Sequence, residues 1–355
     1  MRLPYLNSLL TMRRSVHDLF WLRFLLLGVL VAGCVEPIDL GSNPNTGGQL
    51  VVEGWVNDVD DIHVVTLRTS TANGVGTNTL GLNAQVSLIT GGGRTIQLIE
   101  NLPGIYETSP GELVGRTGDT YQLMVTLANG EQYESTRVTL PESVGLGNTF
   151  DEFIENRGTT DNGTPFVTYS HDLFVQLENT EQLHYVKLES TGWARRRIDY
   201  GFEAAGPLEC WEFINPIDRA VVLTNNTGIV GDFYPWRLVN IPVDFRGNFI
   251  AEIYADAMSL EAFAYWEQAR VQLARGGGVF DPPFAPVVGN ISNVNRPEEI
   301  VLGYFHAYAR TMTRYCYSRL GVPGQFDIPR ITVPTLCTDV YAPAAFELPF
   351  EGICP

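Results

Sequence analysis

The most distinctive chemical group near the start of the sequence is the thiol of Cys34, which ends the run Val31-Ala32-Gly33-Cys34. Small residues before a cysteine let a signal peptidase hold the chain in an extended conformation, and the thiol can then carry a lipid. This order of residues is the lipobox that bacterial lipoprotein processing requires. An ordinary signal peptide with a chance cysteine is the alternative. We predict that Cys34 is lipidated and becomes the first residue of the mature chain.

The residues before Cys34 have the layout of a secretory signal peptide, with a basic leader ahead of an apolar segment at residues 21–33. That segment is too short to cross a bilayer comfortably, which needs about 20 apolar residues. Several acyl chains would instead hold the protein on the membrane, since each buried CH₂ contributes about 0.8 kcal/mol. We expect a signal peptide over residues 1–33 and a lipidated, polar, flexible tether over residues 34–48.

The cysteines that remain are even in number, and they are Cys210, Cys316, Cys337 and Cys354. In an oxidising compartment this indicates two disulfides, for which three pairings are possible. Cys337 and Cys354 flank a proline-rich C-terminal tail, so we expect a bridge between them and a second bridge between Cys210 and Cys316. A zinc site is the rival interpretation, but the sequence has no Cys-x-x-Cys pair and its five histidines are scattered.

A candidate surface for a ligand or a partner combines a basic run with three tryptophans, and its members are Trp193, Arg195, Arg196, Arg197, Trp211 and Trp236. The arginines can dock a carboxylate or a lipid headgroup, although a solvated strand end gives the same pattern. The tryptophan rings can line a binding surface or fill a core.

Signatures of catalysis are missing from the sequence, which has no Gly-x-Ser-x-Gly elbow, phosphate loop, dinucleotide fingerprint or His-Glu-x-x-His motif. His171 and Asp172 suggest a catalytic pair, but neighbouring residues of a strand point to opposite faces. Asp58, Asp60 and Asp61 fall short of a calcium loop and suit a solvated turn. We therefore expect no cofactor, no metal and no enzymatic activity, with a hydrolase built on two distant carboxylates as the alternative.

The chain is strongly acidic, with a net charge of −17. The signal segment carries four arginines and one aspartate, so its removal makes the mature chain more acidic still. Nucleic acid and anionic lipid surfaces repel such a chain, and we expect no nucleic-acid partner.

Residues 49–141 are predicted to form short strands. Hairpins are indicated around the glycines at 91–93 and around the Asn-Gly turn at 128–130. About seven strands within about 90 residues favour an immunoglobulin-like or transthyretin-like β-sandwich. Residues 142–355 are predicted to form a larger β-rich domain with one or two helices. The clearest helix is expected near 259–275, between an N-cap at Ser259 and a glycine run.

Several segments in a fixed order carry a family resemblance over nearly the whole mature chain. In the first region they are Leu50-Val51-Val52-Glu53-Gly54, Pro103-Gly104-Ile105-Tyr106 and Gly118-Asp119-Thr120-Tyr121-Gln122-Leu123. In the second region they are Tyr265-Trp266-Glu267-Gln268, the run from Gly276 to Pro283, Gly289-Asn290-Ile291 and Val301-Leu302-Gly303-Tyr304-Phe305. Together with the lipobox, this order resembles the domain-of-unknown-function 4249 family of Bacteroidota lipoproteins.

Two of these segments also have a structural interpretation. We expect Gly289 and Asn290 to form a turn with positive φ, and Gly303 to let its strand pack closely against a neighbour.

The resemblance implies an outer-membrane lipoprotein that is usually paired with a TonB-dependent receptor of the SusC-like kind. Glu36 and Asp39 resemble the surface-export signal of Bacteroidota lipoproteins, and either leaflet stays open. We expect a lipid-anchored outer-membrane protein that is a non-enzymatic accessory or binding subunit of a TonB-dependent, SusC-like transporter or a related envelope assembly. A stand-alone surface lipoprotein that binds glycans or peptides is the alternative.

Replacing Cys34 with serine tests the lipid attachment. We expect the wild-type protein to incorporate labelled palmitate and to sediment with membranes, and Cys34→Ser to do neither, because the thiol that receives the lipid is gone. Ser42→Ala, in the same tether, should behave as the wild type. Label that persists in Cys34→Ser would rule this cysteine out.

Overall fold

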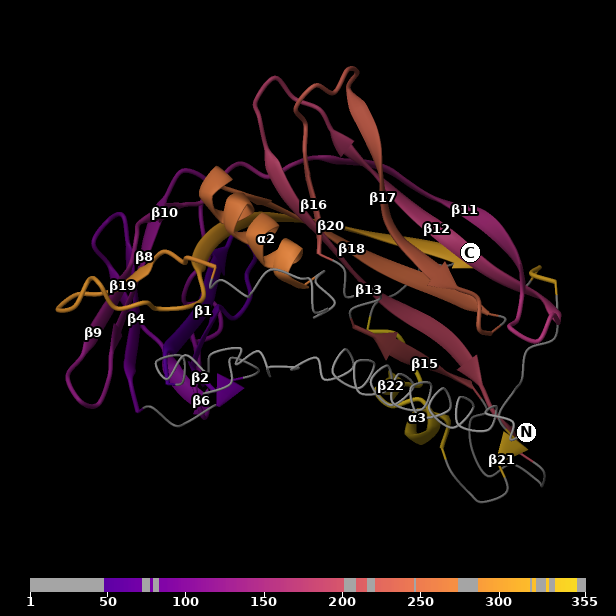
Figure 1. Cartoon of the computed structure of the whole chain (residues 1–355), viewed down its shortest axis with the longest axis horizontal. Coiled ribbons are helices and arrows are strands. Elements are labelled where there is room, and N and C mark those ends of the chain that lie inside the picture. The colour runs from indigo at the N-terminus through magenta and orange to yellow at the C-terminus, as the bar shows by residue number, and fades with distance from the viewer. Residues whose placement is uncertain are drawn as a thin grey trace, which may run out of the picture. The chain divides into compact units, whose positions relative to one another are not determined.

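The computed structural model describes residues 48–71, 77–78, 83–200, 209–215, 221–245, 247–273, 287–319, 321–323, 330–331 and 336–349 (Figure 1). The described chain is mainly β, with several antiparallel sheets and two helices, which confirms the predicted fold class. Cys34, Cys354, the signal segment and the glycine run after the predicted helix lie outside the described residues.

Short strands dominate the region up to residue 141. They are β1 (Leu50–Asn57), β2 (Val64–Ser70), β3 (Thr77–Asn78), β4 (Gln85–Thr90), β5 (Thr95–Gln97), β6 (Ile99–Leu102), β7 (Ile105–Glu107), β8 (Thr120–Thr126), β9 (Gln132–Ser135) and β10 (Val138–Thr139). The predicted hairpins are confirmed, since β4 pairs antiparallel with β5 and β8 with β9.

Longer strands follow. They are β11 (Leu146–Thr159), β12 (Pro165–Glu178), β13 (Tyr185–Arg197), β14 (Asp199–Tyr200), β15 (Glu209–Ile214), β16 (Val222–Asn225), β17 (Phe233–Pro242), β18 (Asn248–Met258), β19 (Ile291–Asn293), β20 (Phe305–Ser318), β21 (Arg330–Ile331) and β22 (Ala344–Ala345). The helices are α2 (Leu260–Leu273) and α3 (Cys337–Val340).

One large sheet runs through both regions in the order β22-β15-β13-β18-β20-β1-β2-β7-β6, with β16 beside β13 and β3 beside β2. Its halves meet where β1 pairs in parallel with β20. The large sheet therefore contains strands from before and after residue 141, where the sequence predicted a domain boundary. The smaller sheets have the orders β19-β9-β8-β4-β5, with β10 beside β8, β11-β12-β17 and β14-β21.

One face of the large sheet carries two hydrophobic cores. In the first core, Val52 and Val56 of β1 pack with Leu88 and Leu123 of the sheet that contains β4 and β8. In the second core, side chains of β13 and β18 pack with those of the β11-β12-β17 sheet. Each buried valine or leucine contributes about 1.5–3 kcal/mol, so these two cores fix the β19-β9-β8-β4-β5 sheet and the β11-β12-β17 sheet on the same side of the large sheet.

Helix α2 packs on the opposite face of the large sheet (Figure 1). The prediction of its start is confirmed: the Ser259 hydroxyl accepts a hydrogen bond from the backbone N–H of Ala262 at 3.2 Å. Phe263 and Ala262 are buried against the sheet residues Met258 and Tyr308. The helix therefore covers one end of this face. No described helix is long and apolar enough to cross a membrane.

The junction of β1 and β20 depends on close backbone contacts. The backbone N–H of Val52 donates to the carbonyl of Leu302 at 2.8 Å, and Gly303 has φ +91°. A Cβ on Gly303 would lie 2.1 Å from the Val52 carbonyl oxygen, and a Cβ on Gly289 would lie 1.8 Å from the Gly303 oxygen. The close packing predicted for Gly303 is confirmed.

The positive φ predicted for Gly289 and Asn290 is wrong, because neither residue is in the left-handed region. Gly289 is needed for the close approach of two backbones. The Asn290 side chain instead acts like a strand partner. Its Nδ2 donates to the carbonyl of Phe305 at 2.7 Å, and its Oδ1 accepts from the N–H of Phe305 at 2.9 Å.

The expected disulfide pairing is wrong. Cys210 of β15 is bonded to Cys337 of α3, with 5.8 Å between the Cα atoms. Cys316 is also in a disulfide. The bridge from Cys337 therefore ties the last described helix to the edge of the large sheet rather than closing the C-terminal tail on itself. The sequence separation of 127 residues explains why local spacing could not reveal this pair.

Replacing Gly303 with alanine should open the β1–β20 junction. We expect the free energy of unfolding to fall by about 3–5 kcal/mol, because the new Cβ clashes with backbone atoms and the positive φ is strained. Gly118 is the matched control, since it has φ +84° with nothing within 4 Å of an added Cβ. Gly118→Ala should lose only about 1–2 kcal/mol. Equal losses in denaturant titrations would contradict the proposed clash.

Candidate functional site

Part of the large sheet's second face lies beyond α2. Strands β15, β13, β18 and β20 are neighbours there, and alternate residues of each strand point to this face. We call the open face the part of this surface formed by Glu189, Thr191, Trp193, Arg195, Trp211, Phe213, Glu252, Tyr254, Met312 and Arg314. Ile250 and Cys316 point to the same side at the next cross-strand position, but Ile250 is buried and Cys316 is in a disulfide, so the open face ends before them.

Aromatic rings occupy one side of the open face. Trp193 and Phe213 are cross-strand partners, and their ring centroids lie 4.7 Å apart at an angle of 41°. Trp211 is the cross-strand partner of Arg195, which also forms an ion pair with Glu209. Rings held in this way present a large contact area that loses little conformational entropy when something binds.

Glu252 fixes the centre of the open face. Its carboxylate accepts hydrogen bonds from Nε1 of Trp193 at 3.2 Å and from the Thr191 hydroxyl at 3.4 Å. Nε of Arg314 donates to its other oxygen at 2.7 Å. Three neighbouring strands are thereby connected through one buried carboxylate, which holds the Trp193 ring and the Arg314 guanidinium in place.

A second ion pair lies at the border of the open face that is nearest to α2. Arg310 makes a bidentate contact with the buried Asp256, at 2.6 and 2.7 Å, and its guanidinium lies 4.8 Å from the centroid of the Tyr254 ring. Burial lowers the pKa of Arg310, but the hydrogen bonds to Asp256 outweigh burial and the net shift is upward. Burial raises the pKa of the Asp256 carboxyl, against the effect of its hydrogen bonds to Arg310. The two-point contact nevertheless holds both side chains in place as a rigid border.

The open face is thus suited to binding by surface contact. Glu189, Arg195 and Met312 are exposed, while the rings beside them are half-buried. Stacking on the rings suits the flat face of a sugar or an aromatic side chain, and the rigid charges supply directional hydrogen bonds. Peptides and glycans both present such groups.

The structure brings together three of the six residues predicted as a binding surface, namely Trp193, Arg195 and Trp211. Arg197 follows at the exposed end of the same strand, with Glu209 as its cross-strand partner. Strand alternation places these four on one side of the sheet.

Arg196 and Trp236 are not on the open face. Arg196 points to the opposite side of β13, where it is buried and pairs with Glu212 at 2.6 Å and Asp244 at 2.8 Å. Trp236 packs against the second core from β17, beside Val175. Both residues therefore stabilise the fold.

The sequence did not predict the other seven residues of the open face, which are Glu189, Thr191, Phe213, Glu252, Tyr254, Met312 and Arg314. A signal was present in residues 248–258, where polar or large side chains alternate with Phe249, Ala251, Ile253, Ala255 and Ala257. That alternation indicates a strand with one buried and one functional or solvated face.

His171 and Asp172 point to opposite sides of β12, as their adjacent positions predict. His171 Nδ1 lies 2.6 Å from a carboxylate oxygen of Asp151, on the core side of β12. Asp172 points to the other side and accepts from Arg237 at 2.8 Å and from Asn240 at 2.6 Å. Within the described residues, no three histidine, cysteine, aspartate or glutamate side chains are grouped to hold a metal ion.

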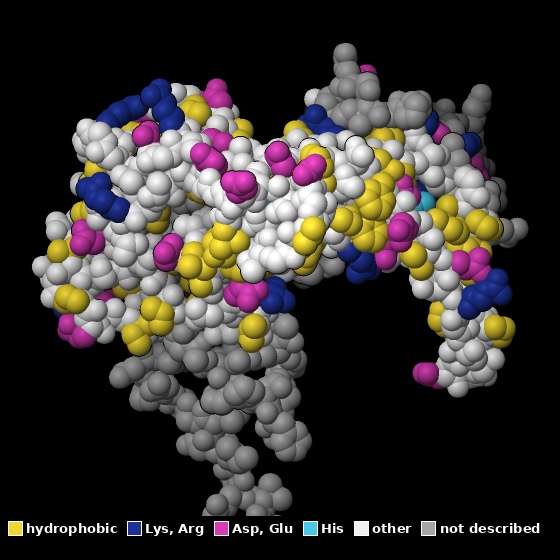
Figure 2. Space-filling view, turned by 90° about the horizontal axis from the view of Figure 1, so that it is seen from above, with side chains coloured by type: hydrophobic (Ala, Val, Ile, Leu, Met, Phe, Trp, Pro, Cys, Tyr) yellow, Lys and Arg dark blue, Asp and Glu magenta, His cyan; other side chains and the backbone are white. Residues whose placement is uncertain are grey.

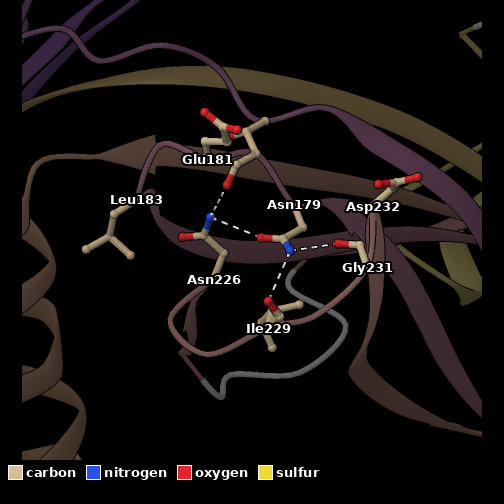
Figure 3. A pocket seen from close by; sticks show the side chains of 8 residues that line it. Asn179, Glu181, Leu183, Asn226, Ile229, Gly231 and Asp232 are labelled. Atoms are coloured by element: carbon tan, nitrogen blue, oxygen red, sulfur yellow. Dashed lines mark hydrogen bonds between the residues drawn. The ribbon is translucent and has the colours of Figure 1, made fainter.

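A cavity of about 440 Å³ lies between the β12–β13 and β16–β17 loops. Figure 3 shows that the amides of Asn179 and Asn226 join these loops. Asn226 Nδ2 also donates to the Thr180 carbonyl, and Asn179 Nδ2 donates to Gly231 and Ile229. The amides are thus occupied by protein carbonyls, which indicates that they brace the loops.

Below α2, the sheet holds a buried neutral histidine. His306 lies beside Trp266 and Tyr308, and Lys187 lies 4.6 Å from the centroid of the Trp266 ring. Burial, with a contribution from the positive charges of Lys187 and Arg310, lowers the pKa of His306 to about 3.

The profile described as "Domain of unknown function (DUF4249)" matches residues 35–314. The chain belongs to the DUF4249 family. No curated protein matches the chain. The matched range includes every residue of the open face and the Gly289–Gly303 junction, and it ends just before Cys316.

The DUF4249 chain should lose stability in acid through His306. An unfolded histidine binds a proton near its ordinary pKa of about 6.5, whereas the folded one does so only near pH 3. The contribution of His306 to the free energy of unfolding is therefore fully present above about pH 6.5, and it is lost as the pH falls toward 3. We expect His306→Gln to remove about 2–3 kcal/mol of the loss between pH 7 and pH 4.5, measured by denaturant titration.

His184→Gln serves as the control for this measurement, because His184 lies in the β12–β13 loop outside the core. It should leave the wild-type acid dependence in place. A His306→Gln curve parallel to the wild-type curve would show that His306 is not the group responsible.

Proposed function

We propose that this DUF4249 protein is a lipid-anchored, non-enzymatic accessory subunit of a TonB-dependent, SusC-like outer-membrane transporter or a related envelope assembly. Its open face would bind the barrel protein or the cargo. The observation that carries the proposal is the open face itself, on which Trp193, Arg195 and Arg314 are held by neighbouring strands.

The physical character of this face suits recognition. Tryptophan, tyrosine and arginine dominate the binding energy of protein interfaces, and the open face has all three. Because Glu252 already fixes Trp193 and Arg314, little side-chain freedom is lost on binding. A sheet surface braced by cross-strand ion pairs is also a suitable base for contacts with a large partner.

The lipobox supports the membrane setting. A lipid on Cys34 would leave a tether over residues 34–48, whose flexible reach is about 20 Å. Such a short tether keeps the sheets close to the bilayer and raises their effective concentration near a membrane partner. An accessory subunit can then work with a modest intrinsic affinity.

Affinity purification of the full lipidated protein from detergent-solubilised outer membranes tests the proposal. We expect a TonB-dependent barrel protein to be recovered with it. Trp193→Ala and Trp211→Ala should each reduce that recovery about tenfold, which corresponds to about 1.4 kcal/mol. Phe233→Ala is the matched control, since Phe233 is an exposed aromatic residue on another sheet. It should leave recovery unchanged.

Recovery of the protein without any barrel would reject the transporter role. Binding of a glycan or peptide to the purified protein, lost in Trp193→Ala and with no barrel recovered, would support the stand-alone alternative instead. The variants Trp193→Ala, Trp211→Ala and Phe233→Ala therefore distinguish the expected result from these two alternatives.

A further inference from the structure

The hairpin formed by β11 and β12 extends beyond the sheet to which it belongs. Strand β17 pairs with β12 only from Ser170 to Glu178, whereas β11 continues along β12 as far as the pair Thr159–Pro165. We call residues 153–169 the ribbon. Figure 2 shows a narrow arm of this kind projecting from the described part of the molecule. A two-stranded hairpin without cover is only marginally stable in water.

One side of the ribbon continues the second core and carries Phe153, Val167 and Tyr169, which we call the aromatic strip. His171 stacks near Tyr317 in the core, with 4.6 Å between the ring centroids. Phe153 follows at 5.4 Å from His171, and Tyr169 at 5.6 Å from Phe153. The strip leaves the core here, because Phe153 is 46% exposed and Val167 is 45% exposed.

The opposite side of the ribbon is mixed. Phe166 is 44% exposed, and its ring lies over Gly158, its cross-strand partner. The polar residues Asn156 and Thr168 are exposed beside it, so the aromatic side is the candidate contact surface.

The base of the ribbon is fixed by a buried polar contact. The Tyr315 hydroxyl of β20 donates to one oxygen of Asp151 at 2.6 Å, and His171 Nδ1 lies 2.6 Å from the other oxygen. This contact joins β11, β12 and the large sheet. The ribbon therefore projects in a defined direction and cannot easily fold back over its own aromatic strip.

The edge of β11 is available for pairing. Among the described strands, β11 pairs only with β12, so its second row of backbone N–H and C=O groups has no strand partner. Such an edge binds an extended segment by adding a strand, and side chains beside it give selectivity.

We propose that the ribbon docks a basic, extended segment of a partner protein, which pairs with the edge of β11 and covers the aromatic strip. The inference rests on the proposed accessory function and specifies which surface of this protein contacts the partner. Charge favours this occupant: Glu155 and Asp161 of the ribbon and Glu152 at its base are exposed, whereas the ribbon has one arginine, Arg157, which pairs with Glu155. A second copy brings the same charge of −17, and anionic lipid is repelled in the same way.

Two variants test the ribbon in the full lipidated protein. In the first, Asn-Gly replaces residues 156–168, so that the cross-strand partners Glu155 and Tyr169 flank a two-residue turn. In the second, Phe153→Thr and Val167→Thr keep a high strand propensity but remove the apolar strip. Ile99→Thr is the matched control, because Ile99 is 56% exposed on an edge strand of the large sheet. Thermal unfolding of each variant verifies that the fold is retained.

We expect both ribbon variants to recover at least tenfold less of the membrane partner than the wild type, and Ile99→Thr to recover the same amount. Benzoylphenylalanine at position 153 or 167 should crosslink to that same partner under ultraviolet light. The crosslinked peptide should contain more lysine and arginine than aspartate and glutamate.

Three results would overturn the inference: full recovery of the partner by the shortened ribbon, crosslinks between two copies of this chain, or crosslinks to lipid alone. If the wild type itself recovers no membrane partner, the proposed function fails. If the wild type and both ribbon variants recover it equally, only the role of the ribbon fails.

Discussion

The parallel pairing of β1 with β20 is the constraint on which the other parts of this structure depend. These strands are about 250 residues apart in sequence, and loop-closure entropy opposes their contact. Gly303 and Gly289 lower the steric barrier, because only their lack of a Cβ lets three backbone segments stack at this point. Asn290 then completes the junction by bonding both backbone groups of Phe305. Once the strands are paired, one sheet serves both cores.

The sharing of that sheet determines where polar groups can go. Its first face is occupied by two cores, so the alternate residues of β13, β18 and β20 must lie on the second face. Charges on the second face are tolerated because each has a partner nearby, as Glu252 has Arg314 and Asp256 has Arg310. Helix α2 covers only one end of this face. The open face is therefore a consequence of the sheet's topology, and its ion pairs make it rigid.

The sequence correctly predicted the features that depend on interactions between neighbouring residues. The hairpins and the Ser259 N-cap each depend on a few adjacent residues, and these predictions are confirmed. The disulfide partner of Cys210 depends on strand order far along the chain, which spacing does not contain. Alternation alone separates Arg195 from Arg196, yet it does not say which of them faces a core. That answer needs the register of β13 against β15 and β18, which is set by tertiary packing.

The open face and the ribbon belong to different layers, which constrains how they can work together. The β11-β12-β17 sheet packs on the side of the large sheet that carries Ala251 and Ile253, whereas Glu252 and Tyr254 point to the open face. One short segment of a partner cannot cover both surfaces without passing around a sheet edge. Substitutions in the two places should therefore have additive effects on binding if each contacts a different segment. Under the proposed function, a segment held by the ribbon would leave the open face to a second segment of the partner or to the cargo.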